Sequence, residues 1–154
     1  MAALVAVVLV TAAPALAPAG PASGVVTPPS ACRLLTTRTA TRSLGGPVDR
    51  PPGNTPAFCA YARRGHATVL VSITLITGAA EVAGSLHEID RRANARVDRL
   101  RAVWYETPSH LLGGEKGGTL TVERHNLVVF MALRGTRHPE QAAELAMSLV
   151  LRQL

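Results

Sequence analysis

Aromatic residues are scarce in this chain. One Trp, two Tyr and two Phe occur among 154 residues. A folded core must therefore consist mainly of Val, Leu, Ile and Ala side chains. The shortage also argues against a single-strand nucleic-acid binder, because such proteins stack successive bases on aromatic rings.

Lysine is nearly absent, and the N-terminal part has no charge at all. The chain has fifteen Arg and one Lys, its net charge is +6, and its first charged residue is Arg33. All of the charge lies in the part that we expect to fold. Such a balance permits binding to an acidic surface, a wall polymer or nucleic acid. An arginine-rich, solvated surface explains it more simply.

A hydrophobic run long enough to cross a membrane is also missing. The uncharged apolar residues 2–17 are interrupted at Pro14 and followed by Pro18, short of the ~20 residues that span a bilayer. They fit the apolar core of a secretory signal, although no Lys or Arg precedes them. We expect a signal peptide over residues 1–22 and a secreted or cell-envelope protein. A retained N-terminal membrane anchor, or a start upstream of Met1, is the alternative.

Cysteine occurs only twice, at Cys32 and Cys59. In an exported chain, two cysteines imply one disulfide. The competing interpretation, a reactive thiol or a metal ligand, would need further ligands at short spacing, and no Cys-x-x-Cys is present. We expect the disulfide to join an N-terminal helix to the first strand of a small domain.

The remaining pattern indicates one α+β domain over residues 32–154, preceded by a flexible lead-in at 23–31. A short helix should carry Leu34, Leu35, Ala40 and Leu44 on one side, begin at Thr36 or Thr37, and stop at Gly45. The other expected elements are strands at 59–63 and 67–75, a helix at 79–99, strands at 102–106, 119–124 and 127–134, and a helix at 139–153. We expect the two residues 125–126 to form a hairpin turn.

Packing follows from the apolar faces of these elements. In the strongest strand, Val69, Val71, Ile73 and Leu75 alternate with more polar residues. The long helix offers the stripe Val82, Leu86, Ile89, Ala93, Val97 and Leu100, and the last helix offers Ala142, Leu145, Ala146, Leu149 and Val150. Since each helix has a single stripe, we predict an antiparallel sheet of about five strands with the helices packed on one face.

Sequence signals for catalysis and cofactors are weak. The five histidines (His66, His87, His110, His125 and His138) include no pair spaced for zinc on a helix. Lys116 in the glycine-rich stretch 113–118 lacks the order of a phosphate loop, and no serine occupies a nucleophile elbow. We therefore expect no metal site, no cofactor and no catalytic residue.

The best candidate site is a cluster of arginines late in the long helix. It consists of Arg91, Arg92, Arg96, Arg99 and Arg101, interrupted by Asp90 and Asp98. On a helix these residues would spread over more than half of the circumference. We expect a solvated face that binds polyanions only weakly and in a salt-sensitive way, without specificity for nucleic acid.

Several short motifs resemble a family of small exported proteins and lipoproteins of actinobacteria that is catalogued only as a domain of unknown function. They are Cys32-Arg33-Leu34-Leu35-Thr36, Leu44-Gly45-Gly46-Pro47-Val48, Cys59-Ala60-Tyr61 and the closing helix that ends at Leu154. The resemblance implies a cell-envelope location, one disulfide and an α+β fold, and it implies no activity. Because Cys32 lacks a lipobox, tethering by a lipid is in doubt.

For function, the sequence favours a non-enzymatic envelope module that binds an unknown partner or ligand. The alternatives are a hydrolase-like envelope enzyme and a membrane-anchored accessory protein. Converging His, carboxylate or Ser side chains in a deep cleft would favour the enzyme, whereas a shallow apolar or basic surface would favour the binding module. The oligomeric state is not predicted.

Overall fold

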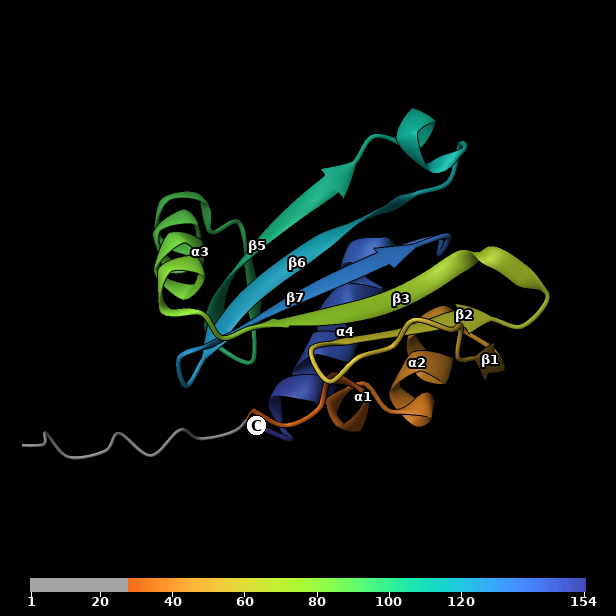
Figure 1. The fold of residues 1–154 in the computed structure, drawn as a ribbon. Helices are drawn as coiled ribbons and strands as arrows, with labels where there is room; N and C mark the ends of the chain where they lie inside the picture. The colour runs from red at the N-terminus through yellow and green to blue at the C-terminus, as the bar shows by residue number, and fades with distance from the viewer. Residues whose placement is uncertain (1–27) are drawn as a thin grey trace, which may run out of the picture.

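A computed structural model describes residues 28–154, which form an α+β fold around one antiparallel sheet (Figure 1). The elements are α1 (Ala31–Leu34), α2 (Thr37–Leu44), β1 (Val48–Asp49), β2 (Phe58–Arg63), β3 (His66–Ile76), α3 (Ala79–Arg92), β4 (Ala95–Val97), β5 (Leu100–Thr107), the 3-10 turn η1 (Ser109–Leu112), β6 (Gly117–Arg124), β7 (Leu127–Arg134) and α4 (Pro139–Leu151). The predicted signal peptide lies outside the described residues. Within them, no helix is long and apolar enough to cross a membrane.

The sheet has seven strands in the order β1-β2-β3-β7-β6-β5-β4, and every neighbouring pair is antiparallel. The α+β class and the antiparallel sheet are therefore confirmed, but the number of five strands was too low. The two unpredicted strands, β1 and β4, are the two edges and contain two and three residues. So few residues show no alternation that a sequence pattern can detect.

The main core lies between one face of the sheet and the helices α1, α2 and α4. Val71 and Ile73 of β3 are fully buried there with Met147 and Val150 of α4. The predicted apolar side of the first helical segment is confirmed, because Leu34, Leu35, Ala40 and Leu44 all belong to this core. The segment is divided into α1 and α2, and the Thr36 hydroxyl accepts a hydrogen bond from the Thr39 N–H at the start of α2.

The end of α2 and the start of α1 lie close to their expected positions. Gly45 ends α2 with a left-handed φ of 68°, a conformation that glycine adopts without steric cost. Ala31, the last residue of the predicted flexible lead-in, is instead the first residue of α1 and is completely buried. Its N–H donates to the Pro56 carbonyl at 2.7 Å.

The predicted stripe of α4 was rotated from the observed one. Leu145, expected inside, is 47% exposed, whereas Ala143, Met147 and Leu151 are fully buried beside the predicted Ala146 and Val150. Nearly every residue between Ala142 and Leu151 is apolar. The buried side is therefore decided by contact with the sheet and α2, and not by the helical period alone.

The prediction that all helices share one face is wrong, because α3 packs on the opposite face of the sheet. Its buried residues Val82 and Ile89 do not belong to the main core. Ile89 instead lines a hollow with Val103 of β5 and Phe130 of β7, and Figure 1 shows α3 and α4 on different sides of the sheet. A helical stripe specifies that a helix packs on a sheet, but it does not specify which face.

The long helix also ends earlier than predicted, at Arg92 and not near residue 99. Asn94, two residues after the helix end, forms side-chain hydrogen bonds with the backbone of Trp104 in β5. Val97 and Leu100 then pair across a tight β4–β5 hairpin, whose turn residues Asp98 and Arg99 have φ values of 46° and 71°. The apolar residues expected on one helix are thus divided between a helix and two strands.

The disulfide between Cys32 and Cys59 is present, as predicted, with a Cα–Cα distance of 5.0 Å. It links α1 to β2 beneath the covered face, and Cys59 is fully buried.

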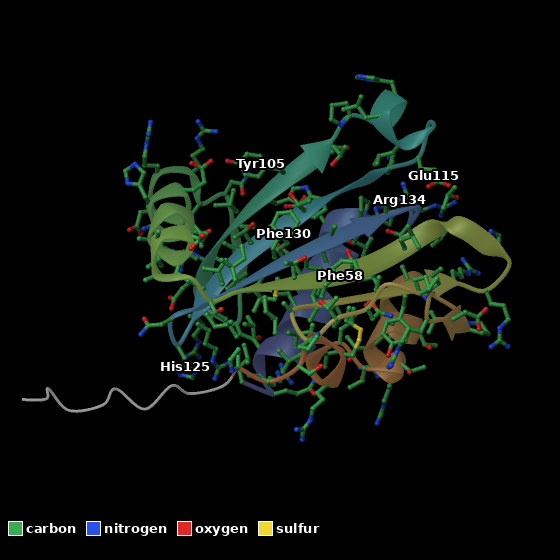
Figure 2. The ribbon with its side chains drawn as sticks, viewed as in Figure 1. Phe58, Tyr105, Glu115, His125, Phe130 and Arg134 are labelled. Atoms are coloured by element: carbon green, nitrogen blue, oxygen red, sulfur yellow. A yellow bond between two sulfur atoms is a disulfide. The ribbon has the colours of Figure 1, made fainter. Side chains whose placement is uncertain are left out.

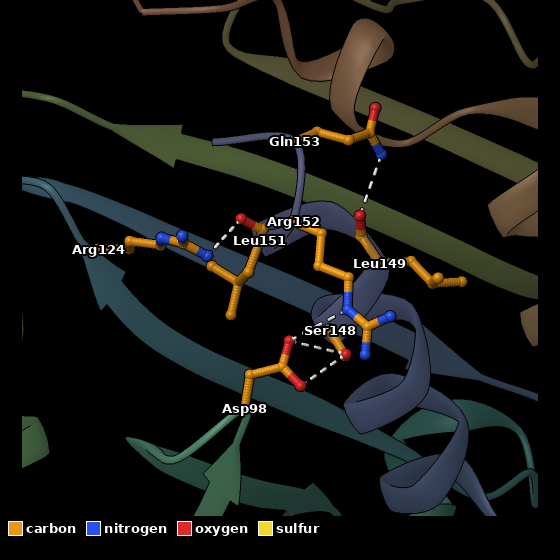
Figure 3. A network of polar contacts seen from close by, with 7 residues as sticks. All are labelled: Asp98, Arg124, Ser148, Leu149, Leu151, Arg152 and Gln153. Carbon is orange, nitrogen blue, oxygen red and sulfur yellow. Dashed lines mark hydrogen bonds and ion pairs between the residues drawn. The ribbon is translucent and has the colours of Figure 1, made fainter.

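The C-terminal end of α4 is held by polar contacts with other parts of the chain, and Figure 3 shows those with Asp98 and Arg124. Ser148 donates to the Asp98 carboxylate at 2.8–2.9 Å, and Arg152 lies 3.6 Å from the same carboxylate. Arg124 at the end of β6 donates to the Leu151 carbonyl, and the Gln153 amide donates to the carbonyls of Leu149 and Leu34. The bonds to the Leu149 and Leu151 carbonyls satisfy backbone groups at the helix terminus that lack partners within the helix.

Candidate functional site on the open sheet face

The face of the sheet that carries α3 is only partly covered, and we call its remainder the open face. Because the strands are in register, its side chains form rows across the sheet. One row contains Phe58, Thr74, Phe130, Thr121 and Val103; the next contains Ala60, Ser72, Ala132, Thr119 and Tyr105; the third contains Ala62, Leu70, Arg134, Gly117 and Thr107. The middle row is small except for Tyr105, so a depression lies between rows of larger residues.

Three of the five aromatic rings lie on this face. Phe58, Tyr105 and Phe130 are labelled on it in Figure 2, and the other two rings, Tyr61 and Trp104, belong to the main core. Phe130 is half-buried in the centre of the sheet, while Tyr105 is 41% exposed. In a chain with so few aromatics, half-buried rings on an uncovered face indicate a surface suited to apolar contact.

The first hollow on the open face lies beside α3. Its volume is about 260 Å³, and it is lined mainly by Ile76, Ile89, Val103, Tyr105 and Phe130. At its rim the Tyr105 hydroxyl donates to the Glu88 carboxylate and accepts a bond of 3.4 Å from Arg92. This hollow is apolar inside and charged only at its edge.

The second hollow lies at the other end of the open face, beneath η1. Its volume is about 250 Å³, and its wall includes Leu70, Leu112 and Arg134. The floor consists of Ser72, Thr119 and Ala132 from the small middle row, and Thr107 contributes a third hydroxyl. It therefore combines an apolar lining with hydroxyls and one guanidinium.

Gly117 makes room for this arrangement. A Cβ at this position would lie 2.7 Å from the Arg134 Cβ and 2.8 Å from the Leu112 Cδ1. Any larger residue would push Arg134 or Leu112 away. Gly117, the first residue of β6, thus shapes the wall of the second hollow.

The structure divides the predicted arginine cluster between separate elements. Arg91 and Arg92 lie in the last turn of α3, Arg96 in β4, Arg99 in the β4–β5 turn and Arg101 in β5. Arg92 forms an ion pair of 3.4 Å with Glu88, four residues earlier, and Arg101 pairs with Asp90 at 2.9 Å. The hydrogen bond to Tyr105, and then the charge of Glu88, raise the pKa of Arg92 above its ordinary value.

Arg96 and Arg101 are cross-strand neighbours, and with Glu144 they line a wide, shallow hollow at the β4 edge. Burial, and then the nearby charge of Glu140, raise the pKa of Glu144 above its ordinary value. A carboxylate therefore lies among the cations. Weak, salt-sensitive binding of polyanions at this edge stays a prediction.

Groups with catalytic chemistry do not meet in a deep cleft in the part of the chain that the structure describes. Within residues 28–154, no group of three or more His, Cys, Asp or Glu side chains is placed to hold a metal. The hollow at the start of α4 contains His138 with Glu106, Glu140, Lys116 and Arg137, and its volume is only about 180 Å³. These mixed charges surround a small surface depression and do not form a deep cleft.

Sequence reasoning identified one strand of the open face, but not the site. The alternation in residues 67–75 separated Leu70 and Ser72 from the buried face, but no pattern showed that β7 supplies Phe130, Ala132 and Arg134 beside them. One signal was available: in the last strand, residues 127–134, both alternating sets are apolar except for the final Arg134. That pattern indicates a central strand with contacts on both faces.

The chain was compared with protein-family models, curated proteins and solved structures, and none of the three comparisons finds a match. The resemblance to the actinobacterial family of exported proteins therefore stays a prediction, carried by the motifs around Cys32 and Cys59.

Proposed function

We propose that this chain is a non-enzymatic binding module of the cell envelope and that it binds its ligand on the open face. The observation that carries the proposal is the pair of shallow hollows at the two ends of an uncovered, largely apolar sheet face. A sheet face that is half-buried without a covering element leaves apolar area exposed to water. A bound ligand would remove that area from water and gain hydrophobic stabilisation.

The rival proposal, a hydrolase-like enzyme, has less support. General acid–base or nucleophilic catalysis needs side chains within hydrogen-bonding reach of one another and of a substrate. Ser72, Thr107 and Thr119 in the second hollow have no His or carboxylate among the residues that line it. Their hydroxyls suit hydrogen bonding to a ligand better than nucleophilic attack.

Titration of the isotopically labelled full chain with small organic probes, followed by NMR, tests the proposal. Hexanol is a suitable first probe because it is neutral and small enough for either hollow. We expect the largest amide shifts in β3, β6 and β7, at the rows that contain Thr74 and Ser72. Shifts confined to α4 or to the β4 edge would contradict the open face as the binding site.

A blocking variant sharpens this experiment. Ala132→Trp should fill the floor of the second hollow and abolish the shifts around it. Ala80→Trp adds the same ring at an exposed position of α3 and is the matched control, which should bind like the unaltered chain. Equal binding by both variants would exclude the second hollow.

Export is the second part of the proposal. It is supported by the apolar run before the domain and by the Cys32–Cys59 disulfide, a bond that persists in oxidising compartments. N-terminal sequencing of protein recovered outside the cell should find a start between about residues 20 and 24, after the small-residue cleavage options. A start at Met1 in that material would argue for a retained N-terminal segment.

A further inference from the structure

We infer that the second hollow binds a small organic carboxylate and that the Arg134 guanidinium is its anchor. This inference rests on the proposed function, because it assigns the chemistry of a ligand to part of the open face. It starts from a charge that has no ion-pair partner within residues 28–154.

Arg134 is the last residue of β7 and is half-buried. Within residues 28–154 its Nε is buried without a hydrogen-bond acceptor, and its guanidinium belongs to none of the four ion pairs. A buried donor without an acceptor costs free energy. The terminal guanidinium nitrogens, which belong to no ion pair within residues 28–154, are the donors that a ligand in the second hollow would meet. The acceptor that best matches the planar fork of an arginine is a carboxylate.

The surroundings of Arg134 restrict the ligand to a single negative charge. Glu115 lies at the same end of the sheet, as Figure 2 shows, and the neighbouring Gly135 N–H donates to the Lys116 carbonyl at 2.7 Å. One oxygen of Glu115 accepts a hydrogen bond from Thr68, and the other is buried and has no hydrogen-bond partner among residues 28–154. This nearby acidic side chain disfavours a dianion such as phosphate more than it disfavours a carboxylate.

The rest of the hollow determines the body of the ligand. Leu70, Leu112 and Ala132 offer apolar contacts, while Ser72, Thr107 and Thr119 offer hydroxyls that form no side-chain hydrogen bond within the described part of the chain. A volume of about 250 Å³ equals roughly eight waters at ~30 Å³ each. A carboxylate with a short aliphatic chain, such as hexanoate, matches this size and lining.

The experiment compares hexanoate with hexanol, which has the same chain length without the charge, by calorimetry and NMR on the full chain. We expect hexanoate to bind at least tenfold more tightly, because hydrogen bonds to charged groups are stronger than those between neutral groups. Its shifts should centre on Arg134, Ala132 and Thr119. Arg134→Gln should reduce hexanoate affinity tenfold or more and bring it within about twofold of the hexanol affinity of the same variant.

Two variants control for charge and for hydrogen-bond geometry. Arg137→Gln removes the same charge three residues later, outside the hollow, and should change hexanoate affinity less than twofold. Arg134→Lys keeps the charge without the fork and should lose less affinity than Arg134→Gln. Circular dichroism checks that the variants fold. If Arg134→Gln does not fold, the comparison of hexanoate with hexanol on the unaltered chain still tests whether the hollow prefers a carboxylate.

The possible failures differ between the two proposals. If hexanol and hexanoate bind equally on the open face, the carboxylate inference fails and the open face remains a binding site. Hexanoate binding that is insensitive to Arg134→Gln overturns the inference in the same way. If neither probe shifts residues of the open face, both proposals fail.

Discussion

Asn94 shows how one side chain can replace a pair of backbone hydrogen bonds. Its amide nitrogen donates to the Trp104 carbonyl at 2.8 Å, and its amide oxygen accepts from the Trp104 N–H at 2.7 Å. Its own N–H donates to the Ala102 carbonyl at 3.1 Å. The carboxamide therefore pairs with β5 as a peptide group would, at the point where α3 has ended and β4 has not begun.

Asn94→Ala should lower the free energy of unfolding by about 1–3 kcal/mol, because it leaves the Trp104 N–H and carbonyl without partners. Chemical denaturation measures this loss. Gln141→Ala, an exposed amide in the first turns of α4, is the control and should change stability by less than ~0.5 kcal/mol. An equal decrease in the free energy of unfolding in the two variants would mean that the Asn94 hydrogen bonds do not stabilise the fold more than an exposed amide does.

Glu144 makes stability depend on pH in the direction opposite to that of an ion-paired carboxylate. Burial, and then Glu140 one turn earlier, raise its pKa in the folded state, so the folded state disfavours its charged form. The penalty is absent below the ordinary carboxyl pKa of about 4.3. It develops as the pH rises through the raised value, because the folded state then has to lose a proton that it binds more tightly.

Glu144→Gln should therefore be more stable than the unaltered chain at pH 7 and equally stable near pH 3. Thermal denaturation at the two pH values measures the difference. A gain of the same size at both pH values would come from packing or helix propensity and not from the charge.

At the scale of elements, the hairpin of β4 and β5 is the segment for which the sequence pattern predicted the wrong secondary structure. Residues 82–100 keep apolar side chains at helical spacing, yet Asp98 and Arg99 adopt positive φ values and turn the chain back on itself. The sequence Asp98-Arg99 is not one of the pairs, Asn-Gly or Asp-Gly, that usually mark such a turn. Asp98 is held from outside by Ser148 and Arg152 of the α4 terminus, a contact that no local pattern contains.

Arg99→Gly should stabilise the protein by about 0.5–1 kcal/mol, since glycine adopts a left-handed φ without the cost that a Cβ imposes. Arg96→Gly, in a strand three residues earlier, should destabilise it. Denaturant midpoints of the two variants decide between a hairpin and the long helix first predicted. A continuous helix would be weakened by glycine at either position.

Other elements were predictable because their signals are local. The strand 127–134 and the two-residue turn before it were predicted with their observed bounds, and His125 and Asn126 do have positive φ values of 54° and 59°. The helix stop at Gly45 was equally local. The short edge strands β1 and β4 were not predictable, because each exists only through pairing with a longer neighbour.

For the whole molecule, the main error concerned the second face of the sheet. Leu70 and Ser72 lie in β3, Phe130 and Ala132 lie in β7, and only the register brings the two pairs into neighbouring rows. Alternation within one strand separates two faces but does not show which face each helix covers. The candidate site therefore depends on the chain connections, and its chemistry could not be predicted from any single segment.

The Cys32–Cys59 bond stabilises the fold as a whole, because it closes a loop that contains α2 and β1. Its reduction should lower the free energy of unfolding by about 3–4 kcal/mol in the chain-entropy account. Denaturation with and without reductant measures the loss. The double variant Cys32→Ser with Cys59→Ser is the control and should be insensitive to reductant.

Mass spectrometry after alkylation adds a direct check. The native protein should bind no alkylating reagent until it is unfolded and reduced, and a peptide linked through Cys32 and Cys59 should be found. Two reactive thiols in the native protein would contradict the disulfide.

The pairing of β3 with β7 also has a consequence for folding speed. The register of β3 and β7 runs from the pair Ile76 and Val128 to the pair Leu70 and Arg134. The partners in each pair are separated by roughly fifty or more residues along the chain, so a large loop-closure entropy must be lost before the strands pair. The hairpin of β2 and β3 and the meander of β5, β6 and β7 involve much shorter separations and can form first. Such non-local strand pairing is typical of domains that fold in milliseconds to seconds. Until it is complete, β3 and β7 each present a free edge that could pair with another copy of the chain.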